Sequence, residues 1–144
     1  MGHLWGEIHS IPTTMFRFFT VYGPWGCPDI APFKFTKGIL EGTPIDIYNN
    51  SEMERDFTYE DDLAHGIRLL IDVVPGGPES AVDGDSLSPI APLRVDNIGN
   101  SYKVKLTDFI NPLEQELGRK AIRNYMPMQP GDVPATWAGC SLLQ

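Results

Sequence analysis

The chain has 144 residues, a formal net charge of −8 and two cysteines, Cys27 and Cys140. This length fits one domain, and the acidic balance gives no broad electrostatic attraction for nucleic acid or an anionic membrane. Two cysteines do not make a disulfide framework, no apolar run reaches the ~20 residues of a membrane span, and the N-terminus does not look like a signal peptide. We therefore expect a cytoplasmic protein. Because the chain is acidic overall, an anionic ligand would need local basic residues. The candidates are Arg17, Lys34, Arg55 and Arg123.

The first half of the chain predicts an alternation of strands and helices. Residues 15–22 are dense in aromatic and β-branched side chains and predict a buried strand, followed by a loop at 25–32. Residues 33–41 have apolar positions at helical spacing, and Gly42 after them is typical of a helix end. Further segments follow this helix. They are a short strand at 45–48, a polar turn at 49–54 and an extended piece at 55–59.

The second half contains the clearest helical pattern. Asp61 and Asp62 open it with two carboxylates, which suit the positive end of a helix dipole. A long loop rich in proline and glycine follows at 75–92, and a strand is expected at 93–98. The last elements are a helix capped by Thr107 that reaches residue 117, with Gly118 after it, and a strand at 121–126. Pro112 should bend or shorten that helix. Strands alternating with helices indicate an α/β architecture.

Four segments carry a family resemblance. They read RFFTVYGPWG at 17–26, RDFTYEDD at 55–62, NIGNS at 97–101 and MQPGDVPAT at 128–136. In wording, order and spacing they resemble extended short-chain dehydrogenase/reductases, and are most similar to UDP-glucuronate 4-epimerases of the bacterial capsule and lipopolysaccharide type. The resemblance implies the C-terminal part of a Rossmann-type fold, mainly its small substrate-binding lobe. Residues 11–27 and 93–100 would belong to the dinucleotide-binding sheet, and residues 28–92 and 101–138 to the UDP-sugar lobe.

The resemblance also implies five substrate-binding residues. Arg55 would grip the UDP pyrophosphate bidentately, and Tyr48 would stack on the uracil. Thr20 would face the sugar ring, while Gln129 and Asp132 would close on the ribose and phosphates. The residue types alone leave structural roles open: an ion pair with Glu52, Glu54 or Asp56 for Arg55, core packing for Tyr48, a backbone bond for Thr20 and a turn cap for Asp132.

NAD is the cofactor that the resemblance implies, and Tyr22 and Pro24 would pass beside its nicotinamide. The printed sequence has no Gly-x-x-Gly-x-x-Gly turn for the pyrophosphate of NAD, and no tyrosine has a lysine four positions later. We therefore expect no catalytic residue in this chain and no activity from it alone. Cys27 also stands where such epimerases usually carry an arginine. The histidines and cysteines lack the spacing of a zinc site, so no metal is expected.

Other functions remain open at this stage. The chain could be a non-catalytic nucleotide-sugar binding or interaction module, or part of a UDP-glucuronate decarboxylase or nucleotide-sugar dehydratase. The sequence Gln-Pro-Gly-Asp at residues 129–132 favours the epimerase. The expected partners are a UDP-sugar and either an N-terminal half or a second copy in a homodimer, with no nucleic acid and no membrane.

Overall fold

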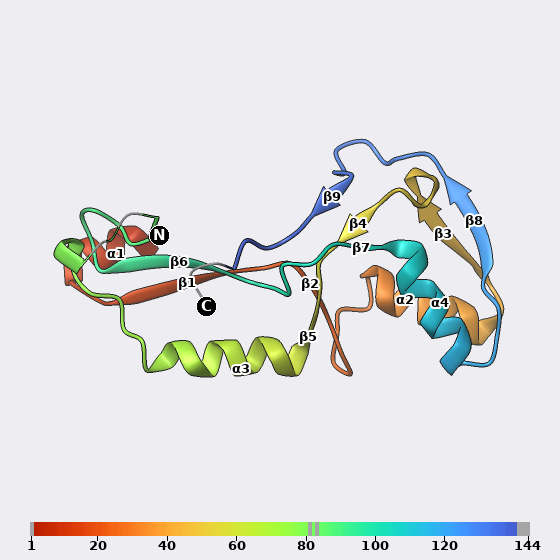
Figure 1. Cartoon of the computed structure of the whole chain (residues 1–144), viewed down its shortest axis with the longest axis horizontal. Helices are drawn as coiled ribbons and strands as arrows, with labels where there is room; N and C mark the ends of the chain where they lie inside the picture. The colour runs from red at the N-terminus through yellow and green to blue at the C-terminus, as the bar shows by residue number, and fades with distance from the viewer. Residues whose placement is uncertain (1, 81, 83, 141–144) are drawn as a thin grey trace.

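The computed structural model describes residues 2–80, 82 and 84–140, and its elements form an elongated molecule (Figure 1). One end contains the strands β1 and β6 with the helices α1 and α3, and the other contains α2, α4, β3 and β8. The helices are α1 (Gly2–His9), α2 (Ala31–Glu41), α3 (Glu60–Ile71) and α4 (Leu106–Glu116), with short 3-10 turns η1 (Asn49–Ser51) and η2 (Pro78–Ser80). The strands are β1 (Thr13–Phe18), β2 (Thr20–Tyr22), β3 (Pro44–Tyr48), β4 (Glu54–Arg55), β5 (Phe57–Tyr59), β6 (Leu93–Ile98), β7 (Val104–Lys105), β8 (Ile122–Met126) and β9 (Ala135–Thr136).

Most strand pairs are parallel and join segments that lie far apart in the sequence. β1 pairs with β6, β2 with β5 and β3 with β8, all in parallel. β4 is the centre of a small sheet, with β7 antiparallel on one side and β9 parallel on the other. Parallel strands with helical connections confirm the predicted α/β class, with the sheets of a partial Rossmann-type fold.

The single strand predicted for residues 15–22 is wrong, because the chain changes partners at Phe19. β1 ends at Phe18, opposite Ile98 of β6, and β2 starts at Thr20, opposite Phe57 of β5. The backbone N–H of Thr20 already donates to the carbonyl of Asp56, at 3.1 Å. A run of β-forming residues indicates an extended chain, but it does not reveal a change of neighbour.

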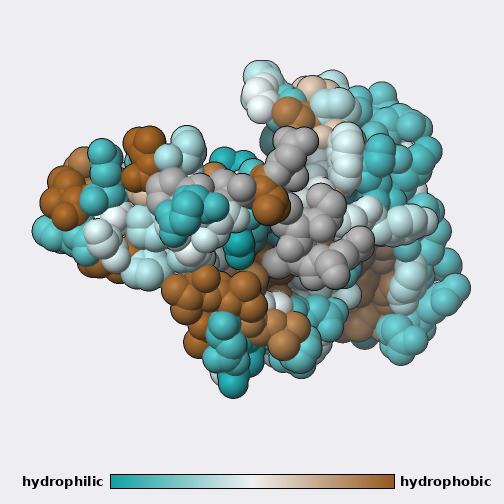
Figure 2. All heavy atoms as spheres, turned by 60° about the vertical axis from the view of Figure 1, so that its left-hand side comes forward, coloured by the Kyte–Doolittle hydropathy of each residue, from teal (hydrophilic) through white to brown (hydrophobic). Residues whose placement is uncertain are grey.

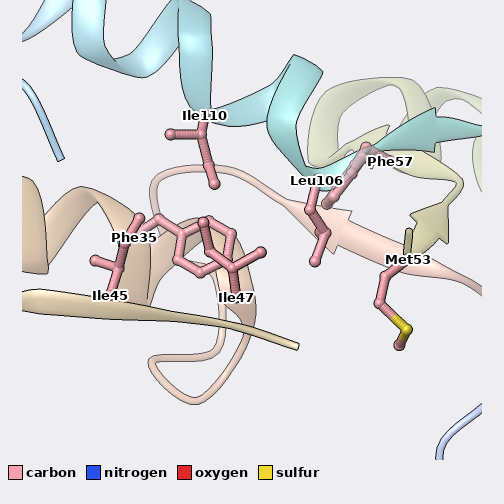
Figure 3. Close-up of a cluster of buried hydrophobic side chains, with 7 residues drawn as sticks. All are labelled: Phe35, Ile45, Ile47, Met53, Phe57, Leu106 and Ile110. Carbon is pink, nitrogen blue, oxygen red and sulfur yellow. The ribbon is translucent and has the colours of Figure 1, made fainter. Parts of the chain in front are cut away.

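The main core lies between α2, β3, β5 and α4 (Figure 3). Figure 3 shows Phe35 of α2 beside Ile45 and Ile47 of β3, with Ile110 of α4 pointing toward them. The cluster consists of Phe35, Ile45, Ile47, Met53, Phe57, Leu106 and Ile110. Ile47 of β3 and Ile110 of α4 have 0% exposure, so the core is closely packed around these two side chains.

The predicted helices α2 and α4 are present, with shifted starts. α2 begins at Ala31, earlier than predicted, because Pro32 fits the first turn of a helix, where no backbone donor is needed. α4 begins at Leu106 without a side-chain cap, so the predicted capping role of Thr107 is wrong. α4 also continues through Pro112 to Glu116, so the expected shortening does not occur. Gly118, with φ 61°, adopts the left-handed conformation at its end, as predicted.

The end formed by β1, β6, α1 and α3 is poorly covered. Helix α1 was not predicted, and α3 has no residue that is fully buried, although its apolar residues follow a helical pattern. Met15 and Phe18 of β1 are 44% and 49% exposed. Figure 2 shows hydrophobic side chains on the surface of this end. Parallel sheets normally have both faces covered, so these strands lack the cover that such sheets usually have.

No helix in the described part of the chain is long and apolar enough to cross a membrane. Across residues 2–80, 82 and 84–140, no group of three or more His, Cys, Asp or Glu side chains is placed to hold a metal ion.

Candidate functional site

The five residues predicted to bind substrate line one cavity of about 320 Å³. Thr20 comes from β2, Tyr48 from the end of β3 and Arg55 from β4, while Gln129 and Asp132 come from the segment between β8 and β9. Core side chains form the apolar part of the wall, and the start of α2 forms another part. The complete lining adds Asp29, Ile30, Ala31, Lys34, Phe35, Asp46, Met53, Phe57 and Leu106. The fold therefore brings together, from four separate segments, the set that the sequence indicated.

Arg55 is held firmly at this cavity, with 17% of its side chain exposed. Its Nη1 donates to the carbonyls of Glu54 at 2.9 Å and Val133 at 3.0 Å, and more weakly to that of Pro134 at 3.5 Å. Its Nη2 donates to Oδ1 of Asp132 at 2.9 Å. The ion pair with a neighbouring acidic side chain, left open from the sequence, is replaced by a pair with a residue 77 positions away.

The bonds of Arg55 leave part of its guanidinium available. A guanidinium has five N–H donors, of which one is on Nε and two are on each Nη. No hydrogen bond to a described residue uses Nε, and only one uses Nη2. Adjacent donors on Nε and Nη2 form the fork that binds two oxygens of a carboxylate or phosphate. Arg55 is therefore held by loop carbonyls and still has donors for an anion.

Asp132 is tied to the loop as well as to Arg55. Its Oδ1 also accepts from the backbone N–H of Val133 at 2.8 Å, and its own N–H donates to the carbonyl of Gln129 at 3.2 Å. The Asp132 side chain is 33% exposed. The carboxylate thus shapes a turn and neutralises part of the charge of Arg55.

Three further charged residues line the cavity. Asp29 and Lys34 lie just before and within the first half of α2, and Asp46 lies on β3, where its Oδ1 accepts from Nδ2 of Asn124 at 2.7 Å. Lys34, one of the four basic candidates from the sequence, is exposed on α2 and also lines this cavity. Two cationic side chains, Lys34 and Arg55, thus face three carboxylates.

A neighbouring cavity of about 380 Å³ shares part of the same wall. Tyr48, Lys34 and Asp46 line both cavities. Tyr48 is half-buried at the end of β3, where the chain turns into η1. Its ring therefore stands between two hollows, where one face of a flat ligand could lie against it.

Tyr22 and Pro24 do not line the cavity around Arg55. The Tyr22 ring packs edge-on against Phe57, Tyr59 and Phe109, with ring centroids 5.5–6.4 Å apart. It lines a separate, mainly apolar cavity of about 510 Å³ between α2 and α4. Pro24 is exposed in the turn that follows β2.

The other two basic candidates are also elsewhere. Arg17 is exposed on β1. Arg123 donates to Oε1 of Glu114 at 3.0 Å and to Asn111 at 2.9 Å. Arg55 and Lys34 are therefore the two of the four sequence candidates that line this cavity.

Asp56 is a buried residue whose role the sequence did not indicate. It has 0% exposure, and its carboxylate accepts backbone N–H bonds from Asn100 at 2.9 Å, Ser101 at 3.0 Å and Ala138 at 2.9 Å. These donors come from two segments far from Asp56 in the sequence. The carboxylate fixes them beside β4, next to Arg55.

A family model and individual relatives place this chain in the same protein family. A model described as "NAD dependent epimerase/dehydratase family" matches residues 2–82. A probable UDP-glucuronate 4-epimerase from Rhizobium meliloti is 50% identical over 149 residues, with 100% of this chain and 43% of the relative covered. Protein CapI from Staphylococcus aureus is 49% identical over 141 residues, with 96% and 42% covered. The chain thus spans less than half the length of these relatives.

Solved structures agree with this comparison. A mutant UDP-glucuronic acid 4-epimerase from Bacillus cereus, in complex with UDP-4-deoxy-4-fluoro-glucuronic acid and NAD, matches with a TM-score of 0.78 and 31% identity. The match covers 98% of this chain and 40% of that one. The same enzyme with UDP-glucuronic acid and NAD matches with a TM-score of 0.76, again over 98% and 40%.

Proposed function

The chain belongs to the NAD dependent epimerase/dehydratase family, and we propose that it forms the nucleotide-sugar binding region of a UDP-glucuronate 4-epimerase. One observation carries this proposal: the five residues expected to contact a UDP-sugar line a single cavity. The Bacillus cereus relative, which covers this chain almost completely, binds UDP-glucuronic acid. The relationship to CapI is consistent with a role in capsule sugar synthesis.

Each residue has a chemical task in this proposal. Arg55 binds the pyrophosphate with the donors on Nε and Nη2 that its loop contacts leave available. Tyr48 stacks on the uracil, and Thr20 presents a neutral hydroxyl to the sugar. Gln129 and Asp132 lie on the segment that Arg55 holds, beside the ribose and phosphates.

We propose that the residues of this chain do not make an NAD site by themselves. The sequence has no Gly-rich turn for the pyrophosphate, Tyr22 is packed into an aromatic cluster, and Pro24 is exposed in a turn. In a 4-epimerase NAD accepts and returns the hydride, and we assign no step of that exchange to the described residues. We propose that residues 11–27 and 93–100 belong to the dinucleotide-binding sheet, and that residues 28–92 and 101–138 form the UDP-sugar lobe.

Calorimetry of the 144-residue chain with UDP, UDP-glucuronate and uridine tests the binding proposal. Loss of a charge-assisted phosphate contact costs roughly 1.5–3 kcal/mol, so Arg55→Ala should weaken UDP more than ten-fold. Tyr48→Ala should weaken uridine and UDP by similar factors. Arg68→Ala is the matched control, because Arg68 is an exposed helix arginine that pairs with Asp72. Equal UDP affinity for wild type and Arg55→Ala would contradict the proposal.

A non-catalytic nucleotide-sugar binding module is the second candidate, because the five residues that line the cavity all have binding tasks in this proposal. The two functions differ once the chain is mixed with a separately made N-terminal part of the Rhizobium meliloti relative. Turnover of UDP-glucuronate with NAD in the mixture, and none with either part alone, supports the epimerase. UDP binding without turnover in a mixture that forms a complex supports the binding module.

A further inference from the structure

Asp132 occupies an unusual position for a residue in an anion-binding cavity, because its carboxylate is already paired with the arginine expected to bind phosphate. We propose that Asp132 is a built-in counter-anion that competes with the phosphates of the nucleotide for Arg55 and thereby sets the affinity and charge selectivity of this cavity. This inference rests on the proposed function, since it concerns the same ligand.

The first step is the contact between the two residues. Nη2 of Arg55 lies 2.9 Å from Oδ1 of Asp132, the distance of a charge-assisted hydrogen bond. The side chains are 17% and 33% exposed, so water screens the pair only in part. A phosphate that approaches Arg55 therefore meets a carboxylate on the same guanidinium.

The second step is that Asp132 is not needed to orient Arg55. Nη1 is fixed by the carbonyls of Glu54 and Val133, at 2.9 and 3.0 Å, with Pro134 at 3.5 Å. These acceptors belong to the backbone and would remain after a change at position 132. The main effect of Asp132 on a ligand at Arg55 is therefore electrostatic.

The third step is the charge of the cavity as a whole. Asp29, Asp46 and Asp132 oppose Lys34 and Arg55, so the cavity has one more carboxylate than cationic side chains. Asp46 is bonded to Asn124, whereas Asp132 is bonded to the cation itself. Removal of the charge of Asp132 thus changes the potential at Arg55 more than removal of any other carboxylate that lines the cavity.

Asp132→Asn separates this role from the two alternatives. Asparagine keeps the size of the side chain and an oxygen acceptor for Val133, but it removes the charge. The affinities of uridine, UMP and UDP are measured by calorimetry for wild type, Asp132→Asn and Asp46→Asn, with circular dichroism to show that each variant is folded. Asp46→Asn controls for the loss of any one negative charge in the cavity.

The proposal predicts an effect that increases with ligand charge. Partly exposed ion pairs are worth a factor of about two to five in an equilibrium constant, so Asp132→Asn should tighten UDP by that factor. UMP should gain less, uridine should not change, and Asp46→Asn should have a smaller effect on UDP.

Each other outcome contradicts the proposal in a recognisable way. Weaker UDP binding with unchanged uridine binding would mean that Asp132 positions Arg55. Weaker uridine binding would mean that it accepts hydrogen bonds from the ribose. Both overturn the counter-anion role while Arg55→Ala still weakens UDP and the proposed function stands. If UDP does not bind wild type, or binds it and Arg55→Ala equally, the proposed function and this inference fail together.

Discussion

Arg55 and Asp56 are consecutive residues whose side chains hold two points of the same returning segment. Arg55 bonds to Asp132, Val133 and Pro134, and the carboxylate of Asp56 accepts the N–H of Ala138. The backbone of Asp56 adds a bond from its N–H to the carbonyl of Thr136 at 3.0 Å. Two neighbouring side chains therefore place the whole 132–138 segment against the cavity.

Asp56→Asn should destabilise the fold, because an amide cannot accept all three backbone N–H bonds that the carboxylate accepts. A buried donor left unpaired costs about 1–3 kcal/mol, and bonds to a charged acceptor are stronger than neutral ones. We expect a loss of about 2–3 kcal/mol in urea unfolding. Asp61→Asn, an exposed carboxylate at the start of α3, is the control. A decrease in the free energy of unfolding below about 0.5 kcal/mol, the range of ordinary surface substitutions, would show that the bonds of the Asp56 carboxylate contribute little.

Glu114 should make the fold sensitive to acid. Its carboxylate accepts from Lys120 at 2.8 Å, from the N–H of Ala121 at 3.0 Å and from Arg123 at 3.0 Å. These bonds, that of Lys120 first, lower the pKa of Glu114 from 4.5 to about 2. A lowered carboxyl pKa stabilises the fold above the unfolded value, near pH 4.5, and this contribution disappears as the pH falls toward 2.

The size of that contribution is at most about 3 kcal/mol, since each pKa unit corresponds to 1.36 kcal/mol. Unfolding free energies of wild type and Glu114→Gln, measured by urea at pH 7, 4.5 and 3, check the prediction. The gap between the two proteins should be largest at pH 7 and should shrink as the pH falls. A gap that is the same at all three pH values would show that Glu114 acts through packing alone.

Asp96 should affect the pH dependence of stability in the opposite direction from Glu114. It is 1% exposed on β6, and neither carboxylate oxygen has a hydrogen-bond partner among the described residues. Burial raises the pKa of Asp96, with Asp85 adding to the rise and Arg94 opposing it. A raised carboxyl pKa means that ionisation disfavours the folded state, so stability falls as the pH rises through the folded pKa.

Asp96→Asn should therefore stabilise the chain at pH 7, because an amide of similar size has no charge to bury. The gain should vanish at pH 3, where the carboxyl is protonated in both states. Asp85→Asn should instead destabilise the chain, because Asp85 accepts from Arg94 and from the N–H of Leu87. Melting curves at both pH values decide between these signs, and a loss of stability in Asp96→Asn at pH 7 would contradict the prediction.

The sequence predicted the elements of this fold better than their pairing. Helices α2 and α4 and strands β3 and β6 follow from apolar periodicity and from Gly42 and Gly118 at helix ends. β4, β7 and β9 are two-residue strands that exist because of one another, so no local pattern could reveal their order. The change of partner at Phe19 is a tertiary effect of the same kind.

The sequence likewise indicated individual residues of the candidate site better than the contacts between them. Arg55 lies in a family motif and Tyr48 at a position that the resemblance implies, but the pair between Arg55 and Asp132 joins positions 77 residues apart. Lys34 and Asp29 belong to the wall only because α2 starts beside the cavity. The burial of Asp56 and Asp96 is equally invisible in the sequence, because a carboxylate in a strand usually faces solvent.

Cys27 provides the last prediction. It is exposed in the loop between β2 and α2, and Asp29 and Ile30, two and three residues later, line the cavity. The family resemblance implies an arginine at this position. A thiol supplies no fixed charge, whereas an arginine there would add a third cation near a cavity in which carboxylates outnumber cationic side chains.

Cys27→Arg should therefore tighten UDP-glucuronate by about two- to five-fold, the range of one partly exposed ion pair. UDP-glucuronate should gain at least as much as UDP, and uridine should not change. Trp25→Arg is the matched control, because it adds the same charge in the same loop at a residue that is 93% exposed and lies two positions further than Cys27 from the cavity-lining Asp29. Calorimetry with the three ligands gives the answer. An equal gain in both variants would indicate a non-specific effect of charge, and no gain for Cys27→Arg would place position 27 outside the reach of the ligand.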